Sequence, residues 1–303
     1  MFKGVNKILI KAITPIHAGV GRALGLIDMP IQKEKHTGIP KIEGSTMKGS
    51  MRESYRLKKY KEKNNEDIVR KEVDKLFGPE DGHESAGIIG FTDAKLLFYP
   101  VITLDGIFAY VTCPYLLNRY LEDKALINNT EFNKKFKDLL EGECEILNNK
   151  CENVKNEIIL DEYCFQETDK SNKVYEDLDL REFNLDSEKQ VVVISDNDFI
   201  EIISLCKEIV TRNKINPETG VVDKDAGSLF TEEYLPAESI LYALVLQNGI
   251  EDNENLYDTY IENDLPNYAQ IGGNATIGKG IVGITKLTEF SNSQGGESNV
   301  SNN

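Results

Sequence analysis

The residues best suited to chemistry gather in one stretch near the start of the chain, between positions 14 and 56. Asp28 stands there as an isolated acid among apolar neighbours, and His17 and His36 are two of the chain's three histidines. Histidine exchanges a proton near neutral pH, and a carboxylate can bind a metal ion or orient a hydroxyl group. On residue type alone, Asp28 is more typical of a turn or a cap. The stretch therefore allows acid–base or metal-assisted chemistry without specifying it.

Positive charge concentrates in the same part of an acidic chain. The 303 residues include 35 Lys and Arg and 51 Asp and Glu, a net charge of −16. Residues 1–63 hold 14 basic and 5 acidic residues, which gives +9 and leaves −25 for the remainder. This asymmetry favours a nucleic-acid-binding face on a chain that otherwise repels polyanions. A solvated lysine-rich surface is the alternative.

The composition is that of a globular protein of the cytoplasm. Apolar residues make up 40% and charged residues 28% of the chain, which is ordinary for this class. No apolar run reaches the length of a membrane span, and lysines interrupt the first apolar residues too often for a signal peptide, so we expect no membrane partner. The cysteines form no CxxC pair and have no zinc-ligand spacing, which predicts free thiols. They are Cys113, Cys144, Cys151, Cys164 and Cys206.

A strand and a helix are predicted at the two ends of this stretch. Residues 7–13 favour a strand, and a glycine-punctuated loop follows it. A helix is predicted with Ser45 as its N-cap, because apolar residues then recur every four positions and would face the core. This buried stripe consists of Met47, Met51 and Tyr55.

The basic residues of the predicted helix form a second stripe. Lys48, Arg52 and Arg56 repeat with the same spacing one position later, about 100° around the helix axis from the buried stripe. A phosphate backbone could run along such a flank. We predict that these three residues and Lys41 contact RNA phosphates, and a solvated helix face is the alternative.

Further elements are predicted along the rest of the chain. A helix at 66–77 should end at a Gly-Pro pair, and two strands should flank residues 105–106. A helix is also predicted at 131–140. Ser195 or its neighbour should cap another helix, whose buried side extends to Val210.

The chain is interpreted as one domain over residues 1–290. Residues from about 120 to 190 are acidic and poor in pattern, which indicates a peripheral insertion, and the segment at 215–236 could form a protruding hairpin. Residues 291–303 lack apolar content and should be a disordered tail. The order of strands and helices favours an α+β class with ferredoxin-like units over a doubly wound parallel sheet.

A glycine-rich segment near the C-terminus, GNATIGKG, nearly matches a nucleotide-binding loop. The match fails at Gly280, where a hydroxyl should bind Mg²⁺, and strand-like sequence follows in place of a helix. We therefore expect a loop that lets the backbone approach a partner chain. The residues that would contact this partner are Gly272, Gly273 and Lys279.

Several segments together resemble one family. They are PIHAGVGRALGLIDMPIQKEKHTGIPKIEGSTMKGSMR, LFGPEDGHESAGIIGFTDAKLLFYPV, YVTCPYLLNRY, INPETGVVDKDAGSLFTEEYLPAE and YAQIGGNATIGKG. They resemble the backbone subunits of type III-B CRISPR (Cmr) RNA-targeting complexes, which are members of the RAMP superfamily. The resemblance extends from residue 10 to residue 285 and is weakest between about 120 and 190.

The resemblance implies a RAMP fold, ferredoxin-like (RRM-like), with insertions and a β-hairpin thumb at about 215–236. Copies of the chain would line up along a guide RNA beside other Cmr subunits, and each copy would cut the target RNA at six-nucleotide intervals. The family's essential acid lies in the motif I-D-x-P-I-Q, which places it at Asp28. A divalent metal, expected to be Mg²⁺, would bind Asp28 and need further oxygens from the RNA phosphate.

Other residues of these motifs have two possible roles each. His17 is a candidate general acid or an orienter of the RNA 2'-hydroxyl, and a role in holding the loop is equally open. Glu232 or Glu233 could reach the cut site of a neighbouring copy, and a surface charge pair is the alternative. His83 and Asp93 also lie in these motifs, where an ordinary turn remains an alternative for the segment around His83.

Two alternatives to an RNA-guided ribonuclease stay open. The chain could be a catalytically silent RNA-binding subunit of the same complex. It could also be a standalone guide-processing nuclease of the superfamily, with a metal-independent histidine site. The latter should not need the thumb segment.

Overall fold

The computed structural model describes residues 2–80, 85–104, 106–128, 130–132, 136–147, 157–168, 175, 178–185, 190–213, 215–222, 229–250, 252 and 254–287. His83 and the predicted tail at 291–303 lie outside these ranges. Within them, no helix is both long and apolar enough to cross a membrane.

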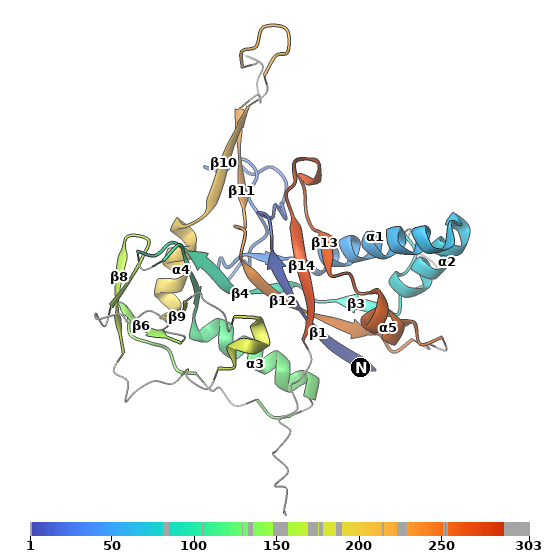
Figure 1. Ribbon diagram of the computed structural model, residues 1–303, viewed down its shortest axis with the longest axis horizontal. Helices are drawn as coiled ribbons and strands as arrows, with labels where there is room; N and C mark the ends of the chain where they lie inside the picture. The colour runs from blue at the N-terminus through green and yellow to red at the C-terminus, as the bar shows by residue number, and fades with distance from the viewer. Residues whose placement is uncertain are drawn as a thin grey trace, which may run out of the picture.

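One large sheet forms the centre of the molecule (Figure 1). Its strands are β1 (Gly4–Ala12), β2 (Lys41–Ile42), β3 (Ile89–Phe91), β4 (Ala94–Val101), β5 (Ala109–Thr112), β6 (Glu143–Ile146), β7 (Glu157–Leu160), β8 (Tyr163–Glu167), β9 (Val191–Ile194), β12 (Ile240–Gln247), β13 (Tyr268–Gln270) and β14 (Ile281–Leu287). The strand order is β13-β14-β1-β12-β4-β5-β9-β6-β8-β7, with β2 paired to β4 and β3 paired to β12. Most pairs are antiparallel, and β5–β9 and β6–β8 are parallel. The predicted mixture of helices and strands is confirmed, and the sheet is mostly antiparallel and not doubly wound and parallel.

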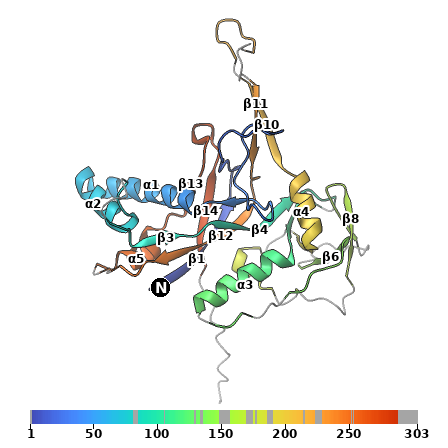
Figure 2. The same ribbon diagram turned by 180° about the vertical axis from the view of Figure 1, so that it is seen from behind.

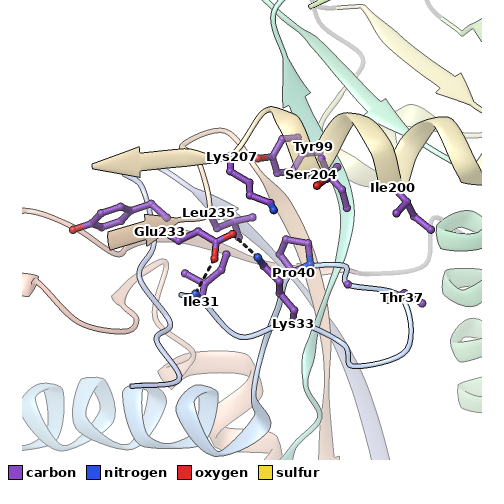
Figure 3. A pocket seen from close by; sticks show the side chains of 13 residues that line it. Ile31, Lys33, Thr37, Pro40, Tyr99, Ile200, Ser204, Lys207, Glu233 and Leu235 are labelled. Atoms are coloured by element: carbon purple, nitrogen blue, oxygen red, sulfur yellow. Dashed lines mark hydrogen bonds and ion pairs between the residues drawn. The ribbon is translucent and has the colours of Figure 1, made fainter. Parts of the chain in front are cut away.

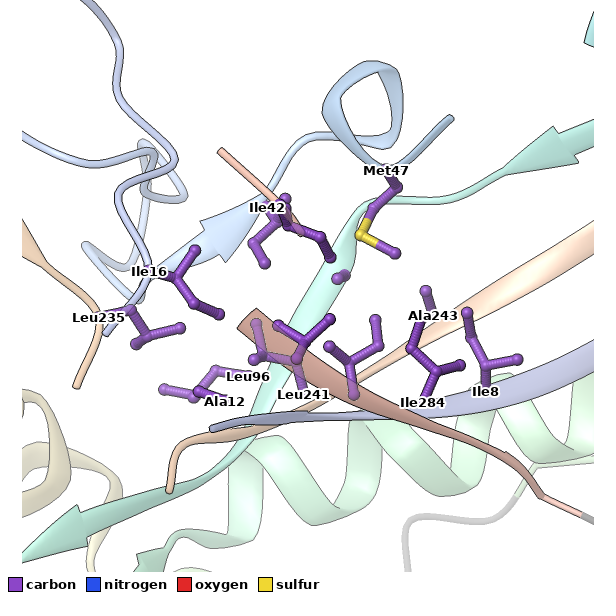
Figure 4. Packing of buried hydrophobic residues seen from close by; sticks show 14 of the residues in the cluster. Ile8, Ala12, Ile16, Ile42, Met47, Leu96, Leu235, Leu241, Ala243 and Ile284 are labelled. Atoms are coloured by element: carbon purple, nitrogen blue, oxygen red, sulfur yellow. The ribbon is translucent and has the colours of Figure 1, made fainter. Parts of the chain in front are cut away.

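Strand β1, near the N-terminus, lies between two strands from the C-terminal part of the chain. It pairs with β12 on one side and with β14 on the other, both antiparallel. Because alternate residues of a strand face opposite sides, Ile8 packs in one cluster with Ala243 and Ile284 (Figure 4), and Leu9 packs in a second cluster. Because β1 lies between β12 and β14, the loop that follows it and contains Asp28 begins at an interior strand of the sheet.

Helix α1 (Gly44–Lys63) covers the first of these clusters. Its predicted stripe is buried. The predicted cap at Ser45 is wrong, because the helix begins at Gly44 and Asp93 supplies the acceptor: the amide of Gly44 donates to Oδ1 of Asp93 at 2.8 Å. A cap from a residue this distant in sequence cannot be predicted from local spacing.

The other helices are α2 (Glu66–Phe77), α3 (Pro114–Asn128), α4 (Asp196–Leu205) and α5 (Leu256–Thr259), with short helical turns η2 (Leu180–Phe183), η3 (Tyr260–Asp264) and η4 (Ala275–Ile277). Helix α2 ends before Gly78, as predicted. The helix predicted at 131–140 is wrong over 136–140, which has no helical structure. There the side chain of Asn118 binds both the amide and the carbonyl of Phe136, which takes the place of helical hydrogen bonds.

Helix α4 ends earlier than predicted. Its cap is confirmed, since Ser195 accepts a hydrogen bond from the amide of Asp198 at 3.1 Å. The predicted helical face at Val210 is wrong, because the chain forms strand β10 (Glu208–Asn213) instead. Consecutive β-branched residues at 209–211 favour a strand, and pairing with β11 (Leu229–Tyr234) satisfies the backbone.

Strands β10 and β11 form a ladder of their own that extends away from the body of the molecule (Figures 1 and 2). The antiparallel register runs from Glu208–Tyr234 at the base to Asn213–Leu229. We call these two strands the hairpin. Its base lies beside the loop that follows β1, which Leu235 joins through a bridge to Ile16.

Candidate nucleic-acid interface and catalytic site

Three segments that are far apart in sequence meet at the base of the hairpin. The loop after β1 contacts β11 through a parallel bridge between Met29 and Glu232. The glycine loop contacts it through Gly273, whose amide donates to the carbonyl of His17 at 2.9 Å. This junction brings together three of the predicted site regions, namely Asp28 with His17, Glu232, and the glycine loop.

Asp28 is an exposed carboxylate held by Thr231. Its Oδ2 accepts hydrogen bonds from the Thr231 amide at 2.8 Å and from the Thr231 hydroxyl at 2.9 Å. The amide of Asp28 donates to the same hydroxyl at 3.0 Å. The bonds from Thr231, together with the nearby charge of Arg22, lower the pKa of Asp28 below its ordinary value. The side chain therefore carries a fixed negative charge at neutral pH.

His17 is buried in the junction, and one ring nitrogen is fixed. Its Nδ1 lies 2.8 Å from the carbonyl oxygen of Glu233. A carbonyl can only accept, so Nδ1 carries the proton. In the neutral ring, Nε2 is then the nitrogen that can accept one, and it lies against Gly19, where a Cβ would come within 2.6 Å. This environment is compatible with both predicted roles, proton exchange and holding the loop.

Glu232 points into a buried network. Its carboxylate pairs with Arg212 and accepts hydrogen bonds from the Tyr234 hydroxyl at 2.6 Å and from the Asn274 amide at 3.1 Å. Burial raises the pKa of Glu232, but these hydrogen bonds outweigh it and the net pKa is lowered. The side chain is 4% exposed. A catalytic role in a neighbouring copy would therefore require this network to open.

Glu233 anchors the segment that follows Asp28. Its carboxylate pairs with Lys33 and accepts a hydrogen bond from the Ile31 amide at 3.3 Å (Figure 3). Its own amide donates to the carbonyl of Met29 at 3.0 Å. These contacts border a cavity of about 190 Å³ beside α4. Glu233 is 1% exposed, so its carboxylate forms a buried ion pair with Lys33.

The glycine loop packs closely on His17. Gly272 has φ +81°, and a Cβ there would lie 2.4 Å from the His17 carbonyl oxygen, so a side chain does not fit. Lys279 turns toward the hairpin, with its Nζ 4.7 Å from the centre of the Tyr234 ring and 3.5 Å from Glu208. The loop therefore binds the hairpin base as well as the Asp28 loop.

Two of the predicted basic contacts are held inside the fold. Lys41 pairs with Asp93 at 2.7 Å and also with Glu43. Arg52 pairs with Asp74 at 2.6 Å and donates to the Gly78 carbonyl. Arg52 therefore joins α1 to α2, which the predicted stripe alone did not indicate.

The other two basic residues differ in their partners. Arg56 pairs with Glu53 at 2.8 Å and with Glu66 at 3.2 Å. Lys48 has no ion pair with any other described residue, and burial and the charge of Arg52 lower its pKa. A half-buried cation without a counterion would gain most from an RNA phosphate.

A groove of about 900 Å³ lies between α1 and the glycine loop. Helix α1 forms one wall with Gly49, Ser50 and Leu57, and Tyr268 and Ala275 line the other. Tyr268 is 68% exposed, and an exposed aromatic ring can stack on a nucleobase. The groove therefore runs beside two elements that the sequence predicts to contact RNA, although none of the predicted contact residues lines it.

The described residues do not form a preformed metal centre. They contain no group of three or more His, Cys, Asp or Glu side chains that could hold an ion. Beside the exposed carboxylate of Asp28 the junction supplies the neutral hydroxyl of Thr231, whereas Mg²⁺ takes about six oxygen ligands, which water and substrate phosphates usually complete. A resident Mg²⁺ therefore does not fit these residues alone.

Sequence reasoning missed the residues that hold the site. Thr231, Arg212, Tyr234 and Asn274 all contact predicted site residues, but they come from the hairpin and the glycine loop. For Thr231, Tyr234 and Asn274 the available signal was their position in the FTEEY and GGNATIGKG segments, next to residues already singled out, whereas Arg212 lies in β10 and had no such signal. Their contacts with the Asp28 loop depend on the fold.

The model of the RAMP superfamily matches residues 9–283. The chain belongs to the RAMP superfamily.

Among its relatives, the chain is similar to the CRISPR system Cmr endoribonuclease Cmr4 of Pyrococcus furiosus. The two are 37% identical over 294 residues, which cover 93% of this chain and 95% of the relative. In structure, it is similar to a chain of the type III-B Cmr-beta complex bound to cognate target RNA, with a TM-score of 0.74, 25% identity, and coverage of 94% and 98%. It is also similar to oligomeric Cmr4 from Pyrococcus furiosus, with a TM-score of 0.70, 27% identity, and coverage of 94% and 99%.

Proposed function

We propose that this chain is a guide-RNA-binding backbone subunit of a type III-B CRISPR complex in the cytoplasm. Several copies would form a filament with other Cmr subunits, and each would cut guide-complementary target RNA at six-nucleotide intervals. The similarity to a protein named an endoribonuclease and to a complex bound to target RNA supports this proposal. The similarity to an oligomeric relative supports the multi-copy assembly.

The observation that carries the proposal is the junction around Asp28. An exposed, ionised carboxylate lies at the base of the hairpin, within the same junction as His17 and the glycine loop. We further propose that the hairpin is the thumb of a single ferredoxin-like RAMP domain, inserted between guide and target. A substrate strand in the groove beside α1 would then pass close to this junction, and Lys48 would bind a phosphate of the guide.

The role of Asp28 follows from its charge. Because its pKa is lowered, the carboxylate is a weak base at neutral pH. It is better suited to orient the 2'-hydroxyl that attacks the phosphate, or to share a divalent ion with the RNA. If Mg²⁺ takes part, Asp28 would be its protein ligand and the RNA phosphate would have to supply other oxygens.

The test is cleavage of a complementary target by an assembled complex that carries Asp28→Asn. Asparagine keeps the shape and an acceptor oxygen for Thr231 but removes the charge. We expect cleavage to fall at least about 100-fold, with guide and target binding unchanged. Undiminished cleavage would show that the nuclease role does not belong to this residue.

One observation favours the second candidate, a catalytically silent RNA-binding subunit. The three hydrogen bonds between Asp28 and Thr231 would also suit a residue that only staples the loop to the hairpin. In that case the Asn variant would assemble and bind RNA in the same way as the wild type, and the wild-type complex would leave the target intact.

A further inference from the structure

The amide, carbonyl and hydroxyl of Thr231 all form hydrogen bonds with the loop that contains Asp28. Its amide and its hydroxyl donate to the Asp28 carboxylate, its hydroxyl accepts from the Asp28 amide, and its carbonyl accepts from the Met29 amide at 3.0 Å. The next bridge, Met29 to Glu232, continues this contact. The segment at 28–29 therefore lies along β11 like a short extra strand.

The hairpin register explains why these groups are available. Thr231 stands opposite Thr211 of β10. Backbone groups of an antiparallel strand alternate between facing the partner and facing away. Since the amide and the carbonyl of Thr231 both reach the Asp28 loop, this residue occupies a position that faces away from β10. The free edge of β11 at the hairpin base is thus what receives the loop.

We propose that Thr231 is a positioning residue for the reaction: it fixes the Asp28 carboxylate to the base of the hairpin, so that the hairpin determines where the charge meets the RNA. This inference rests on the proposed nuclease function. The donors leave the carboxylate little freedom to rotate, because two of them share Oδ2 and the amide of Asp28 is bound to the same hydroxyl. The second carboxylate oxygen is then oriented by the hairpin.

The side-chain hydroxyl can be removed without changing the backbone. Thr231→Val keeps the β-branched shape, which suits a strand, and leaves the backbone bonds in place. Thr231→Ser retains the hydroxyl. Thr211→Val is a matched control, because it makes the same substitution on the opposite strand at an exposed residue with no contact to Asp28 among the described residues.

The experiment compares these variants in the guide-loaded complex under single-turnover and steady-state conditions. For Thr231→Val we expect kcat to fall about 10- to 100-fold, as for other residues that orient a reacting group, with KM and guide binding unchanged. Thr231→Ser should restore most of the rate, and Thr211→Val should cut like the wild type. If valine prevents folding, Thr231→Ala in the same assay makes the same prediction.

A second readout separates positioning from a general structural effect. Titration of the Asp28 carboxyl by ¹³C NMR in the full chain should show a higher pKa in Thr231→Val than in the wild type, since one stabilising hydrogen bond is lost. Thr211→Val should leave the pKa unchanged. A variant that only loosened the hairpin would lose guide or target binding together with cleavage.

The outcomes distinguish this inference from the proposed function. If Asp28→Asn stops cleavage but Thr231→Val cuts at the wild-type rate, Thr231 does not position the site, while the nuclease assignment stands. If Asp28→Asn cuts at the wild-type rate, the nuclease assignment fails and the positioning role fails with it.

Discussion

At the scale of single residues, the site is a charge held by hydrogen bonds and not a cluster of acids. Asp28 is exposed, and Thr231 is its principal partner. The two acidic residues that follow Thr231 on β11, Glu232 and Glu233, are buried and paired with Arg212 and Lys33. Of these three described carboxylates only that of Asp28 is exposed to a substrate, so further ligands for a metal ion would have to come from the RNA.

This arrangement predicts how the protein responds to metal. We expect chelation to abolish target cleavage, because an ion shared with the RNA would be removed. Adding Mg²⁺ to the isolated chain should move its melting temperature by less than about 1 °C, since an ion that binds the folded protein stabilises it only in proportion to its affinity. Differential scanning calorimetry with and without Mg²⁺ measures this. A shift of several degrees would indicate a preformed site.

The lowered pKa of Glu232 predicts that the free energy of unfolding depends on pH. The pKa of Glu232 is lowered in the folded protein. The ionised side chain therefore adds to the free energy of unfolding above the ordinary pKa of 4.5, and this stabilisation is lost as the pH falls through the lowered pKa of the folded state. Glu232→Gln should cost about 1–3 kcal/mol at pH 7, because Arg212 loses its partner. The free energy of unfolding of wild type and variant should converge toward pH 3.

Chemical denaturation between pH 7 and pH 3 checks this convergence. The control is Glu218→Gln, an exposed residue farther out on the same segment, which should change stability little at any pH. A constant difference between wild type and Glu232→Gln over this range would mean that the ion pair does not carry the effect.

The identity of Asp28 as the key acid could be predicted from its motif, but its environment could not. Thr231 lies 203 positions away, and no periodicity connects the two. The same holds for Arg52, which the helical spacing assigned to an exposed stripe and the structure pairs with Asp74. A helical pattern specifies which residues share a face, and the neighbouring element decides whether that face is free.

At the scale of elements, glycines decide how closely the C-terminal loop approaches the Asp28 loop. Gly272→Ala should destabilise the protein by at least about 3 kcal/mol, because it adds a clash with the His17 carbonyl to the cost of a left-handed conformation. Gly278→Ala is the matched control. It has a similar φ of +76°, and its Cβ would meet nothing within 4 Å, so it should cost about 1 kcal/mol.

Thermal unfolding of the two variants measures this difference. We expect the melting temperature of Gly272→Ala to fall several degrees below that of Gly278→Ala. Equal losses would mean that the loop moves away from His17 without cost, and that the close packing does not hold the junction.

Element boundaries were predictable where the local sequence decides them. Helix α2 ends at its Gly-Pro pair, and Ser195 caps α4, since both signals act within one turn. The predictions failed where a distant partner decides. Asp93 caps α1 in place of Ser45, and pairing with β11 converts the predicted end of α4 into strand β10.

At the scale of the whole molecule, an acidic chain carries its predicted basic stripe on α1, on residues that do not line the groove. The charge asymmetry that predicted a nucleic-acid face is visible in the sequence, but the sequence cannot indicate which cations remain unpaired. The structure leaves Lys48 without an ion pair among the described residues, whereas Arg52 and Arg56 are neutralised within the chain. Lys48 should therefore contribute more to guide binding than the other two.

Salt dependence measures this contribution. Lys48→Ala should weaken guide binding and reduce the slope of log affinity against log salt by about 0.7 to 1, the value for one phosphate contact. Lys71→Ala removes the same charge from α2, where we predict no RNA contact, and should leave the slope unchanged. Equal effects of both variants would mean that the net charge of the chain matters and the position of Lys48 does not.

The strand order was the least predictable feature of the fold. The order of elements favoured an α+β class over a doubly wound parallel sheet, yet the pairing of β1 with β12 and β14 joins residues at opposite ends of the chain. That pairing, with the hairpin between β10 and β11, is what assembles the junction. Local patterns predict which segments are strands, and only packing of the complete chain selects their neighbours.

Complexes assembled from mixtures of wild-type and Asp28→Asn subunits show whether each copy cuts with its own Asp28. All copies then share the same guide and the same target. If each copy uses its own carboxylate, target fragments should disappear position by position, in proportion to the fraction of variant subunits, while guide occupancy stays constant. Cutting at every position at the full rate, whatever the fraction of variant, would mean that Asp28 does not cut the target.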